Sequence, residues 1–418
     1  MSIGRIIKNN YVLSLLSKML LIVLGIVNSV LINRYLGPSL KGEYIFILNV
    51  VNLLVLFFNL GIYQSYPYYK RRQTNMIQNK YVNNVFFQFI IYFIIAIIIS
   101  VFVNKISYSI ILTLLPLMIL TKQLSFILMI ENINLRNIIN IISALFYTVI
   151  LVIVYFFTNI NYMNIIISLY AKDIILISMF IFVYKLKPNP LKYDKEMLLK
   201  SIKFGIGPTI IILLLNLNYK VDILILKLFE DNYYIGIYSV GIMLAEQAWI
   251  FSDAFKEVLF AKTSKKDSVD EIVRVVKLNI YLNLIMLIII LLFGELIIRI
   301  LYGLEFIEAY TITSIIFLGI TGMVIYKLIY PYYMANGLRK LSIVFLSIVS
   351  ATNILLNLLF IPLWGILGAA IASVFSYNLC GFMFLIDFNK RTGLKLKDFI
   401  LITKDDIIFL KSVFNKPS

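Results

Sequence analysis

Charged side chains interrupt several of the long apolar runs of this sequence. Lys18, Lys122, Lys220 and Lys327 each lie within a run of mostly hydrophobic residues. A lysine near the centre of a bilayer costs roughly 2.5–3.5 kcal/mol on insertion scales, so it normally faces a cavity or a partner. We expect these four lysines to line one central cavity. Its positive charge would attract an anionic ligand, with a phosphate or pyrophosphate as the first candidate.

Two carboxylates in similar surroundings suggest a second role. Asp222 lies two residues after Lys220, and Glu246 lies in the next apolar run. A carboxylate inside a span can bind a cation or exchange a proton, because burial shifts the balance between its charged and neutral forms. Asp222 and Glu246 are therefore candidates for ion coupling.

Structural ion pairs are the alternative role for these charges. Lys172 and Asp173 are adjacent in another apolar run, and Asp253 follows Glu246 in the same part of the chain. Pairing between helices would neutralise such groups without any ligand. Lys18 or Lys172 could also extend its ammonium group towards the lipid headgroups. The sequence leaves these alternatives open.

The sequence lacks the residues that most catalytic and metal sites require. It has no histidine and a single cysteine, Cys380, which excludes histidine relays, a multi-cysteine metal site and an intrachain disulfide. The segment "GPSLKGEY" (37–44) has the glycine spacing of a phosphate-binding loop, but it continues with Glu43-Tyr44 rather than Lys-Ser or Lys-Thr. We expect no enzymatic activity, no catalytic residues, no metal and no cofactor.

Composition places the chain in a membrane. Of its 418 residues, 61% are hydrophobic and 14% are charged, whereas soluble domains have about 45–50% and about 25%. Runs such as "IIYFIIAIIISVFV" (90–103) are apolar on all sides, which predicts helices rather than the alternating strands of a barrel. The predicted spans are 11–33, 43–66, 82–103, 108–130, 138–158, 162–184, 204–226, 233–255, 278–298, 309–334, 342–360 and 366–386.

Basic residues are distributed very unequally between the two sides of these predicted spans. If the N-terminus is inside, only Arg34, Lys41, Lys105, Lys227 and Arg299 of the 38 Lys and Arg residues fall in outer segments. Such an asymmetry is typical of positive-inside sorting. The net charge of +17 is therefore explained by orientation in the cell membrane, with both termini cytoplasmic and with anionic lipids as neighbours. It does not indicate a nucleic-acid partner.

An internal repeat organises the chain. A shift of 194 positions pairs Asn28 with Asp222, Gly42 with Gly236, Tyr44 with Tyr238 and Asn52 with Glu246. Each half has six predicted spans, so the repeat is parallel and a substrate site is expected between the halves. The expected fold is an all-α polytopic membrane protein of about twelve transmembrane helices in two parallel six-helix lobes.

The predicted domains follow from this repeat. They are an N-terminal lobe (1–184), a basic cytoplasmic linker (185–203), a C-terminal lobe (204–386) and a basic cytoplasmic tail (387–418). Within the tail, residues 398–414 could form an amphipathic helix at the membrane interface or a solvated extension.

Several segments resemble a known transporter family. They include "RYLGPSLKGEY" (34–44), "YKVDILILKLFEDNYYIGIYS" (219–239) and the long ordered pattern "NLLFIPLWGILGAAIAS" (357–373). Over about residues 5–390 the chain resembles the Wzx-type O-antigen flippases, polysaccharide transporters of the MATE-like MOP superfamily. One departure is the second outer hairpin, which reads "FEDNYYIG" (229–236) in place of a Gly-Pro turn.

The resemblance implies a substrate and a mechanism. The substrate would be undecaprenyl-pyrophosphate-linked oligosaccharide repeat units, moved from the cytoplasmic to the outer leaflet for O-antigen and lipopolysaccharide, capsule or another surface polysaccharide. Two lobes would alternate access to a cationic cavity, and an ion gradient would reset them. The family resemblance supports the proposed roles of Lys220 and Asp222 more directly than those of Lys18, Lys122 or Lys327. Partners would be the lipid-linked glycan, membrane lipids, and the glycan polymerase and chain-length proteins of the pathway.

Three other functions fit parts of the pattern. A multidrug or small-molecule exporter of the same superfamily would favour an acidic cavity, whereas the spans here hold slightly more lysines than carboxylates. A membrane glycan polymerase or ligase would need a larger outer loop with catalytic groups. A lipid II flippase resembles this family but usually has two further spans.

Overall fold

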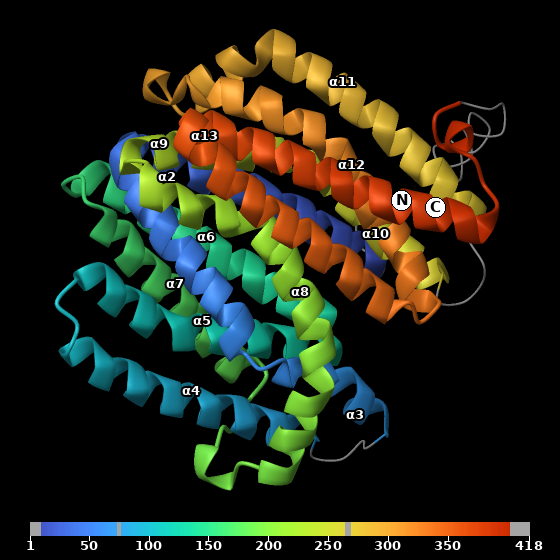
Figure 1. The fold of residues 1–418 in the computed structure, drawn as a ribbon. Coiled ribbons are helices and arrows are strands. Elements are labelled where there is room, and N and C mark those ends of the chain that lie inside the picture. Colours follow the sequence, from blue (N-terminus) through green and yellow to red (C-terminus); the bar gives the residue numbers. More distant parts are fainter. Residues whose placement is uncertain (1–9, 73–76, 264–268, 402–418) are drawn as a thin grey trace, which may run out of the picture. The chain divides into compact units, whose positions relative to one another are not determined.

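The computed structural model describes residues 10–72, 77–263 and 269–401. This part of the chain folds into helices only. The α-helices are α2 (Asn10–Phe58), α3 (Tyr66–Arg72), α4 (Ile77–Val101), α5 (Ile106–Glu131), α6 (Ile133–Phe157), α7 (Tyr162–Val183), α8 (Lys195–Phe229), α9 (Asn232–Glu246), α10 (Trp249–Thr263), α11 (Val269–Leu301), α12 (Ala309–Ala335) and α13 (Arg339–Thr392) (Figure 1). Most of the proposed helix at 398–414 lies outside the described residues.

The helices account for the predicted number of spans. In the described residues, nine helices are long and apolar enough to cross a membrane, and the bent pair α9–α10 makes a tenth candidate. Two of these helices contain a non-helical residue, Gly37 in α2 and Gly365 in α13. Both glycines have a positive φ, of 63° and 56°, which a residue without a Cβ adopts easily. Dividing α2 and α13 there gives twelve spans, each about as long as a bilayer requires.

The chain divides into two compact units. Unit 1 comprises Met1–Leu213 and unit 2 comprises Leu214–Ser418. The division falls inside α8, so the first half of this helix belongs to unit 1 and the second half to unit 2. The linker predicted at 185–203 holds the short helix η2 (Pro190–Lys192) and the first turns of α8. Each unit has its own helix packing.

In unit 1, α2 is a hairpin whose arms follow different neighbours. The arm before Gly37 runs along α6 and the arm after it runs along α5. The side-chain contacts that fix this register are Thr148–Asn28 (2.8 Å), Tyr35–Thr158 (2.8 Å), Ser107–Glu43 (3.2 Å) and Gln123 to the Asn59 carbonyl (2.9 Å). The two arms therefore run in opposite directions, as the turn-forming "LGP" sequence predicts.

In unit 2, α13 folds back at Gly365 in the same way. Phe345 packs on Phe384 (ring centroids 5.2 Å apart), and Asn353 donates to Ser376 (2.8 Å). The residue numbers of such partners rise on one arm as they fall on the other, which is the signature of an antiparallel pair. α12 lies against the second arm, and its Gly322 meets the backbone near Tyr377.

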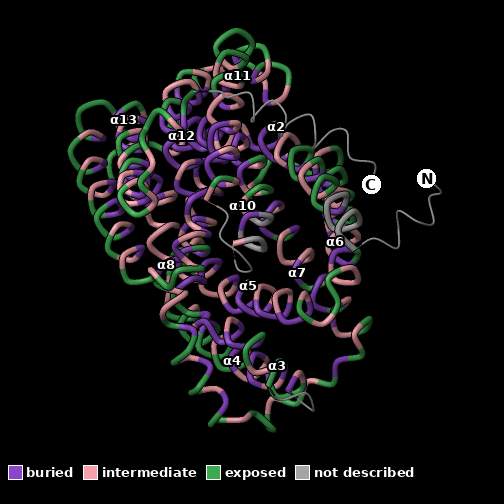
Figure 2. Tube along the Cα trace, turned by 90° about the vertical axis from the view of Figure 1, so that its right-hand side faces the viewer, coloured by how far each residue is buried: buried purple, intermediate pink, exposed green. Residues whose placement is uncertain are grey.

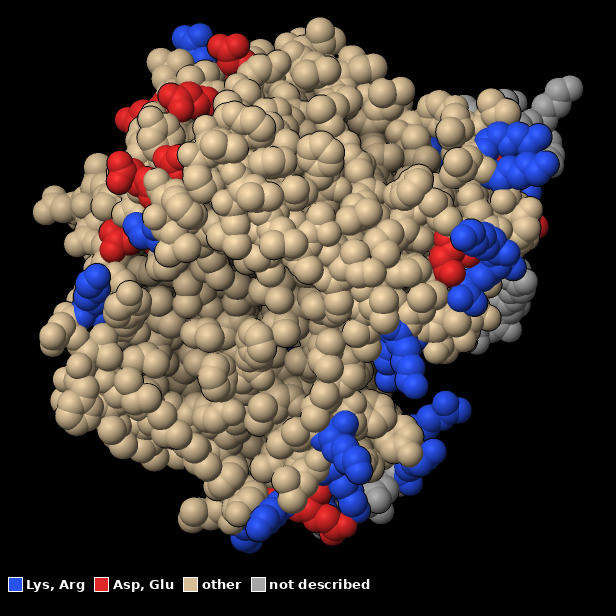
Figure 3. Space-filling model, in the orientation of Figure 1, with Lys and Arg blue, Asp and Glu red and all other residues tan. Residues whose placement is uncertain are grey.

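Exposure and charge follow the pattern expected of a protein in lipid. α5 and α12 are largely buried, whereas α11 carries many exposed leucines and isoleucines (Figure 2). On the face drawn in Figure 3, charged side chains gather near the helix ends, and uncharged surface covers the helices between them. The uncharged surface suits the hydrocarbon region, where an exposed charge would be costly.

Candidate functional site

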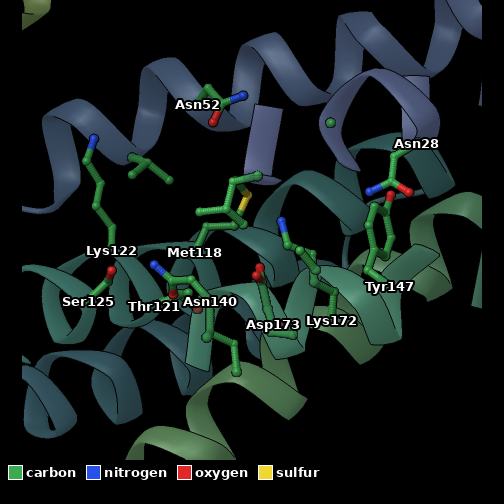
Figure 4. Close-up of a pocket in the computed structure, with 16 residues that line it drawn as sticks. Asn28, Asn52, Met118, Thr121, Lys122, Ser125, Asn140, Tyr147, Lys172 and Asp173 are labelled. Atoms are coloured by element: carbon green, nitrogen blue, oxygen red, sulfur yellow. The ribbon is translucent and has the colours of Figure 1, made fainter. Parts of the chain in front are cut away.

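Unit 1 contains a cavity of about 570 Å³. It is enclosed by α2, α5, α6 and α7, as Figure 4 shows. Ten of its lining residues are polar or charged: Asn28, Asn52, Thr121, Lys122, Ser125, Asn140, Ser143, Tyr147, Lys172 and Asp173. A cavity with this many polar groups inside a membrane helix bundle is suited to a polar ligand or to water.

Helical periodicity brings these side chains to one place. On α5 the lining residues Met118, Thr121, Lys122 and Ser125 recur at intervals of three and four, and so occupy one face. On α6 the same spacing holds for the lining residues between positions 140 and 147. The polar stripes of α5 and α6 therefore form part of the cavity wall, together with residues of α2 and α7.

Lys122 supplies an uncompensated positive charge. Its side chain extends from α5 into the cavity (Figure 4). Within the described part of the chain, no residue forms a hydrogen bond or an ion pair with its ammonium group. Because an unpaired ammonium in a membrane protein is costly, it needs water or an anionic ligand there.

Lys172 and Asp173 bring opposite charges to another side of the cavity. Both project from α7 (Figure 4), and Asp173 is buried, with an exposed fraction of 8%. The Lys172 ammonium lies 5.4 Å from the centre of the Tyr147 ring, close enough for a cation–π contact. Because the two charges are adjacent, this side of the cavity is close to neutral.

The remaining polar lining is neutral. Asn28 accepts a hydrogen bond from Thr148 (2.8 Å) and keeps its amide N–H groups as donors. The buried Ser143 hydroxyl has no partner among the described residues. Amides and hydroxyls can both donate and accept, so this wall could bind the hydroxyl groups of a sugar.

In unit 2 the predicted lysines have carboxylate partners. Lys220 of α8 lies 3.2 Å from Glu246 of α9. Lys327 of α12 lies 2.9 Å from Asp253 of α10, and its ammonium is 4.2 Å from the centre of the Trp249 ring. These contacts favour the ion-pair alternative for both lysines in this conformation.

Asp222 is held by hydroxyl groups. The Tyr238 hydroxyl donates to its carboxylate at 2.5 Å, and the backbone N–H of Ile223 donates at 2.8 Å. The Ser373 hydroxyl lies 3.5 Å away. Asp222 is buried, and these hydrogen bonds stabilise its carboxyl group.

A second cavity, of about 470 Å³, lies in unit 2. Its lining includes Glu230, Glu308 and Trp364. Burial raises the pKa of the Glu230 carboxyl, and the neighbouring negative charge of Asp231 acts in the same direction. The two carboxylates make this cavity negatively charged, which disfavours an anionic ligand.

The residues that the sequence singled out belong to both units. Lys122 lines the cavity of unit 1, whereas Lys18 is exposed on the first arm of α2 and is not among the lining residues. Lys220, Lys327, Asp222 and Glu246 all belong to unit 2.

Sequence reasoning missed much of the cavity wall. It considered Lys172 and Asp173 as an ion pair, or Lys172 as a residue that extends towards the lipid headgroups, and overlooked Thr121, Ser125 and Asn140 as site residues. The signal was present, because the polar residues of 121–125 and 140–147 recur at helical spacing within apolar runs.

Comparison with known proteins identifies the family. A sequence profile of the polysaccharide biosynthesis protein family matches residues 7–252, more than half of the chain. The chain belongs to this family. No curated protein matches the sequence closely enough to count as a relative.

Solved structures agree on the fold of this family member. Lipid II flippase MurJ in an inward closed conformation has a TM-score of 0.76 at 17% identity, over 97% of this chain and 94% of that chain. An inward-facing multidrug resistance MATE transporter of the MOP superfamily has a TM-score of 0.67 at 10% identity, over 88% of this chain and 94% of that chain. A MOP superfamily transporter from Pyrococcus furiosus has a TM-score of 0.60 at 10% identity, over 91% of this chain and 94% of that chain. This chain thus has the MurJ/MATE-like fold and, with nine or ten candidate spans among its described residues, is a multi-pass membrane protein.

Proposed function

We propose that the protein is a flippase for undecaprenyl-pyrophosphate-linked oligosaccharide repeat units. It would move them from the cytoplasmic to the outer leaflet for O-antigen, capsule or another surface polysaccharide. Membership of the polysaccharide biosynthesis family and the MurJ-like fold support a lipid-linked cargo. The observation that carries the proposal is the Lys122 ammonium, which has no partner among the described residues, in a cavity whose other polar lining residues are mostly neutral.

The cargo has three parts, and each requires a different binding environment. The pyrophosphate is anionic, and Lys122 offers it a charge-assisted hydrogen bond. The sugar hydroxyls would bind the neutral wall that includes Asn28 and Ser143. The polyprenyl chain would stay in the lipid, where it loses no hydrophobic stabilisation.

Transport would proceed by alternating access without any covalent step. The cavity binds the headgroup when it opens to the cytoplasmic side, and rearrangement of the two units exposes it to the outer side. Lys220 and Lys327 would contribute to substrate attraction in states in which their carboxylate partners release them. Lys18, which is exposed on α2, is proposed as a further cationic contact for the arriving headgroup.

An ion gradient would drive the return step. Asp222 and Glu246 are the proposed coupling residues, because both are carboxylates within the helices of unit 2. Binding of a cation or a proton at either site would change its contacts with Tyr238 or Lys220 and so favour one conformation. The glycan polymerase and chain-length proteins of the same pathway would take over the delivered units.

The leaflet on which the glycan lipid accumulates tests the function. Cells that lack the protein would be probed with a membrane-impermeant glycan-binding reagent, on intact cells and on inverted vesicles. We expect complete repeat units to accumulate on the cytoplasmic side, and the wild-type gene to restore their export. Lys122→Gln should restore export at least tenfold less well than Lys105→Gln, a matched change at an exposed lysine outside the cavity.

Other distributions would identify another function. Units that reach the outer face but stay unpolymerised would indicate a polymerase or ligase. Unchanged glycan lipids together with altered drug sensitivity would indicate a multidrug exporter. Full export with Lys122→Gln would remove this lysine from the mechanism.

A further inference from the structure

Arg136 does not itself line the unit 1 cavity but is bonded to a residue that does. It stands in the first turn of α6, whose start is capped by Asn132, with the Asn132 side chain accepting the Leu135 N–H at 3.0 Å. The Arg136 Nε donates to the Ser125 hydroxyl at 3.0 Å. Ser125 lines the cavity, so the guanidinium is bonded directly to the cavity wall.

The positions of Arg136 on α6 and of Ser125 on α5 support this placement. Arg136 precedes the lining residue Asn140 by four positions, so it extends the polar stripe of α6 by one turn. Ser125 follows Lys122 by three positions and extends the stripe of α5 in the same way. Since α5 and α6 are joined at Asn132, both extensions lead to the end of the cavity where the two helices meet.

The guanidinium also retains free donors. Besides the Nε bond, the guanidinium forms one bond to the described residues, from Nη1 to the Asn137 side chain at 3.0 Å. Arginine has five N–H donors in a planar fork, so N–H groups remain for a ligand. Glu131, the carboxylate at the end of α5, is already paired with Lys70 at 2.7 Å and does not neutralise Arg136.

We propose that Arg136 is a second phosphate-binding residue, acting with Lys122 on the diphosphate of the cargo. This inference rests on the proposed function and extends it by naming the group that selects a diphosphate. A diphosphate diester carries two negative charges. The Lys172 charge is offset by Asp173, so the two positive charges available on the α5–α6 side are Lys122, which lines the cavity, and Arg136, which is bonded to the lining residue Ser125. Arginine also binds phosphate oxygens in a bidentate way that lysine does not.

A purely structural role is the competing explanation. The bond to Ser125 could serve only to hold α6 against α5. In that case Ser125→Ala would have the same effect as Arg136→Gln, and neither change would alter the choice between phosphate ligands. If Arg136 binds the second phosphate, its loss should reduce the preference for a diphosphate over a monophosphate.

Ligand binding to the purified full-length protein distinguishes the two. Affinities for farnesyl diphosphate and farnesyl monophosphate would be measured in detergent by calorimetry for wild type, Arg136→Gln, Ser125→Ala and Lys122→Gln. Arg72→Gln is the matched control, because Arg72 is exposed and stacks on Tyr68 of α3, away from the cavity. Circular dichroism would confirm the helical content of every variant.

The expected pattern is specific. Arg136→Gln should weaken farnesyl diphosphate binding about tenfold or more and leave monophosphate binding within about threefold of wild type. Ser125→Ala should weaken both ligands by less than about threefold, and Arg72→Gln should match wild type. Arg136→Lys should recover part of the diphosphate affinity, because it restores the charge without the planar fork.

Several results would overturn the inference. If Arg136→Gln keeps the full diphosphate preference while Lys122→Gln loses binding, Arg136 is not a phosphate residue and the flippase proposal stands. If Ser125→Ala and Arg136→Gln weaken both ligands equally, the role is structural. If wild type binds neither ligand, the phosphate site of unit 1 fails together with this inference, whatever the leaflet measurement shows.

Discussion

Lysines within the helices occupy two distinct environments. Lys122 faces a cavity and has no partner among the described residues, whereas Lys327 is buried, stacks on Trp249 and pairs with Asp253 at 2.9 Å. A buried charge that loses its only partner is strongly destabilised, while replacement of a whole pair by uncharged groups is often neutral. The two kinds of lysine should therefore respond differently to substitution.

The Lys327–Asp253 pair provides a direct test. We expect Asp253→Asn to lower stability by about 1–3 kcal/mol, because Lys327 remains buried and charged. The loss stays below that of a fully buried pair because the Asp253 side chain is 49% exposed. The double variant Lys327→Met, Asp253→Asn should be more stable than Asp253→Asn alone. Thermal unfolding in detergent measures both, and additive losses would contradict the pairing argument.

The sequence indicates charged residues inside spans but not their partners. The positions of Lys122 and Lys327 follow from hydropathy alone. Asp253, however, lies 74 positions from Lys327, and such a pairing depends on how α10 packs against α12. Arg136 was assigned to a loop because the span was predicted to begin at 138, whereas α6 begins at Ile133. An asparagine cap at 132 was the available signal for the earlier start.

Close helix packing in unit 2 depends on glycine. A Cβ on Gly322 of α12 would lie 2.3 Å from the Tyr377 carbonyl oxygen, and one on Gly381 of α13 would lie 2.4 Å from the Gly322 carbonyl oxygen. Both contacts are with backbone, which cannot rotate away as a flexible side chain can. Small residues at membrane helix interfaces allow such an approach.

Alanine at Gly322 should therefore force α12 and α13 apart. We expect Gly322→Ala to cost about 1–3 kcal/mol, the range typical of overpacking in a tight core, and to lower the unfolding temperature in detergent. Gly25→Ala is the control, because among the described residues no atom beyond its own stretch of helix lies within 4 Å of its added Cβ. This variant should be neutral or slightly stabilising, since alanine favours helix more than glycine. Equal unfolding temperatures for the two variants would show that the α12–α13 contact tolerates a methyl group.

The helices themselves were largely predictable. Long apolar runs and the "LGP" sequence led to twelve spans and to a turn near Gly37, and the structure has its hairpin break at that residue. The break at Gly365 was not predicted as a positive-φ position, although the two spans flanking it were. The sequence pattern does not reveal how far each polar stripe extends around a cavity, because that depends on which helices become neighbours.

Orientation in the membrane connects these observations to the direction of transport. The proposed entry end of the cavity is marked by Arg136, which lies at the same end of α5 and α6 as the basic helix α3, whose Lys70 contacts Glu131. Positive-inside sorting would place this end in the cytoplasm. A diphosphate-linked glycan made on that side would then meet Arg136 first and Lys122 deeper in the cavity.

Cysteine labelling tests this orientation. Lys105, at the opposite end of α5, and Leu191, in the basic linker, are both exposed, and the native Cys380 is buried and should react slowly. We expect Lys105→Cys to react with a membrane-impermeant maleimide in intact cells, and Leu191→Cys to react only after permeabilisation. The reverse pattern would place Arg136 on the outer side. The cationic entry would then face away from the cytoplasmic glycan lipid, and outward flipping through this cavity would lose its physical basis.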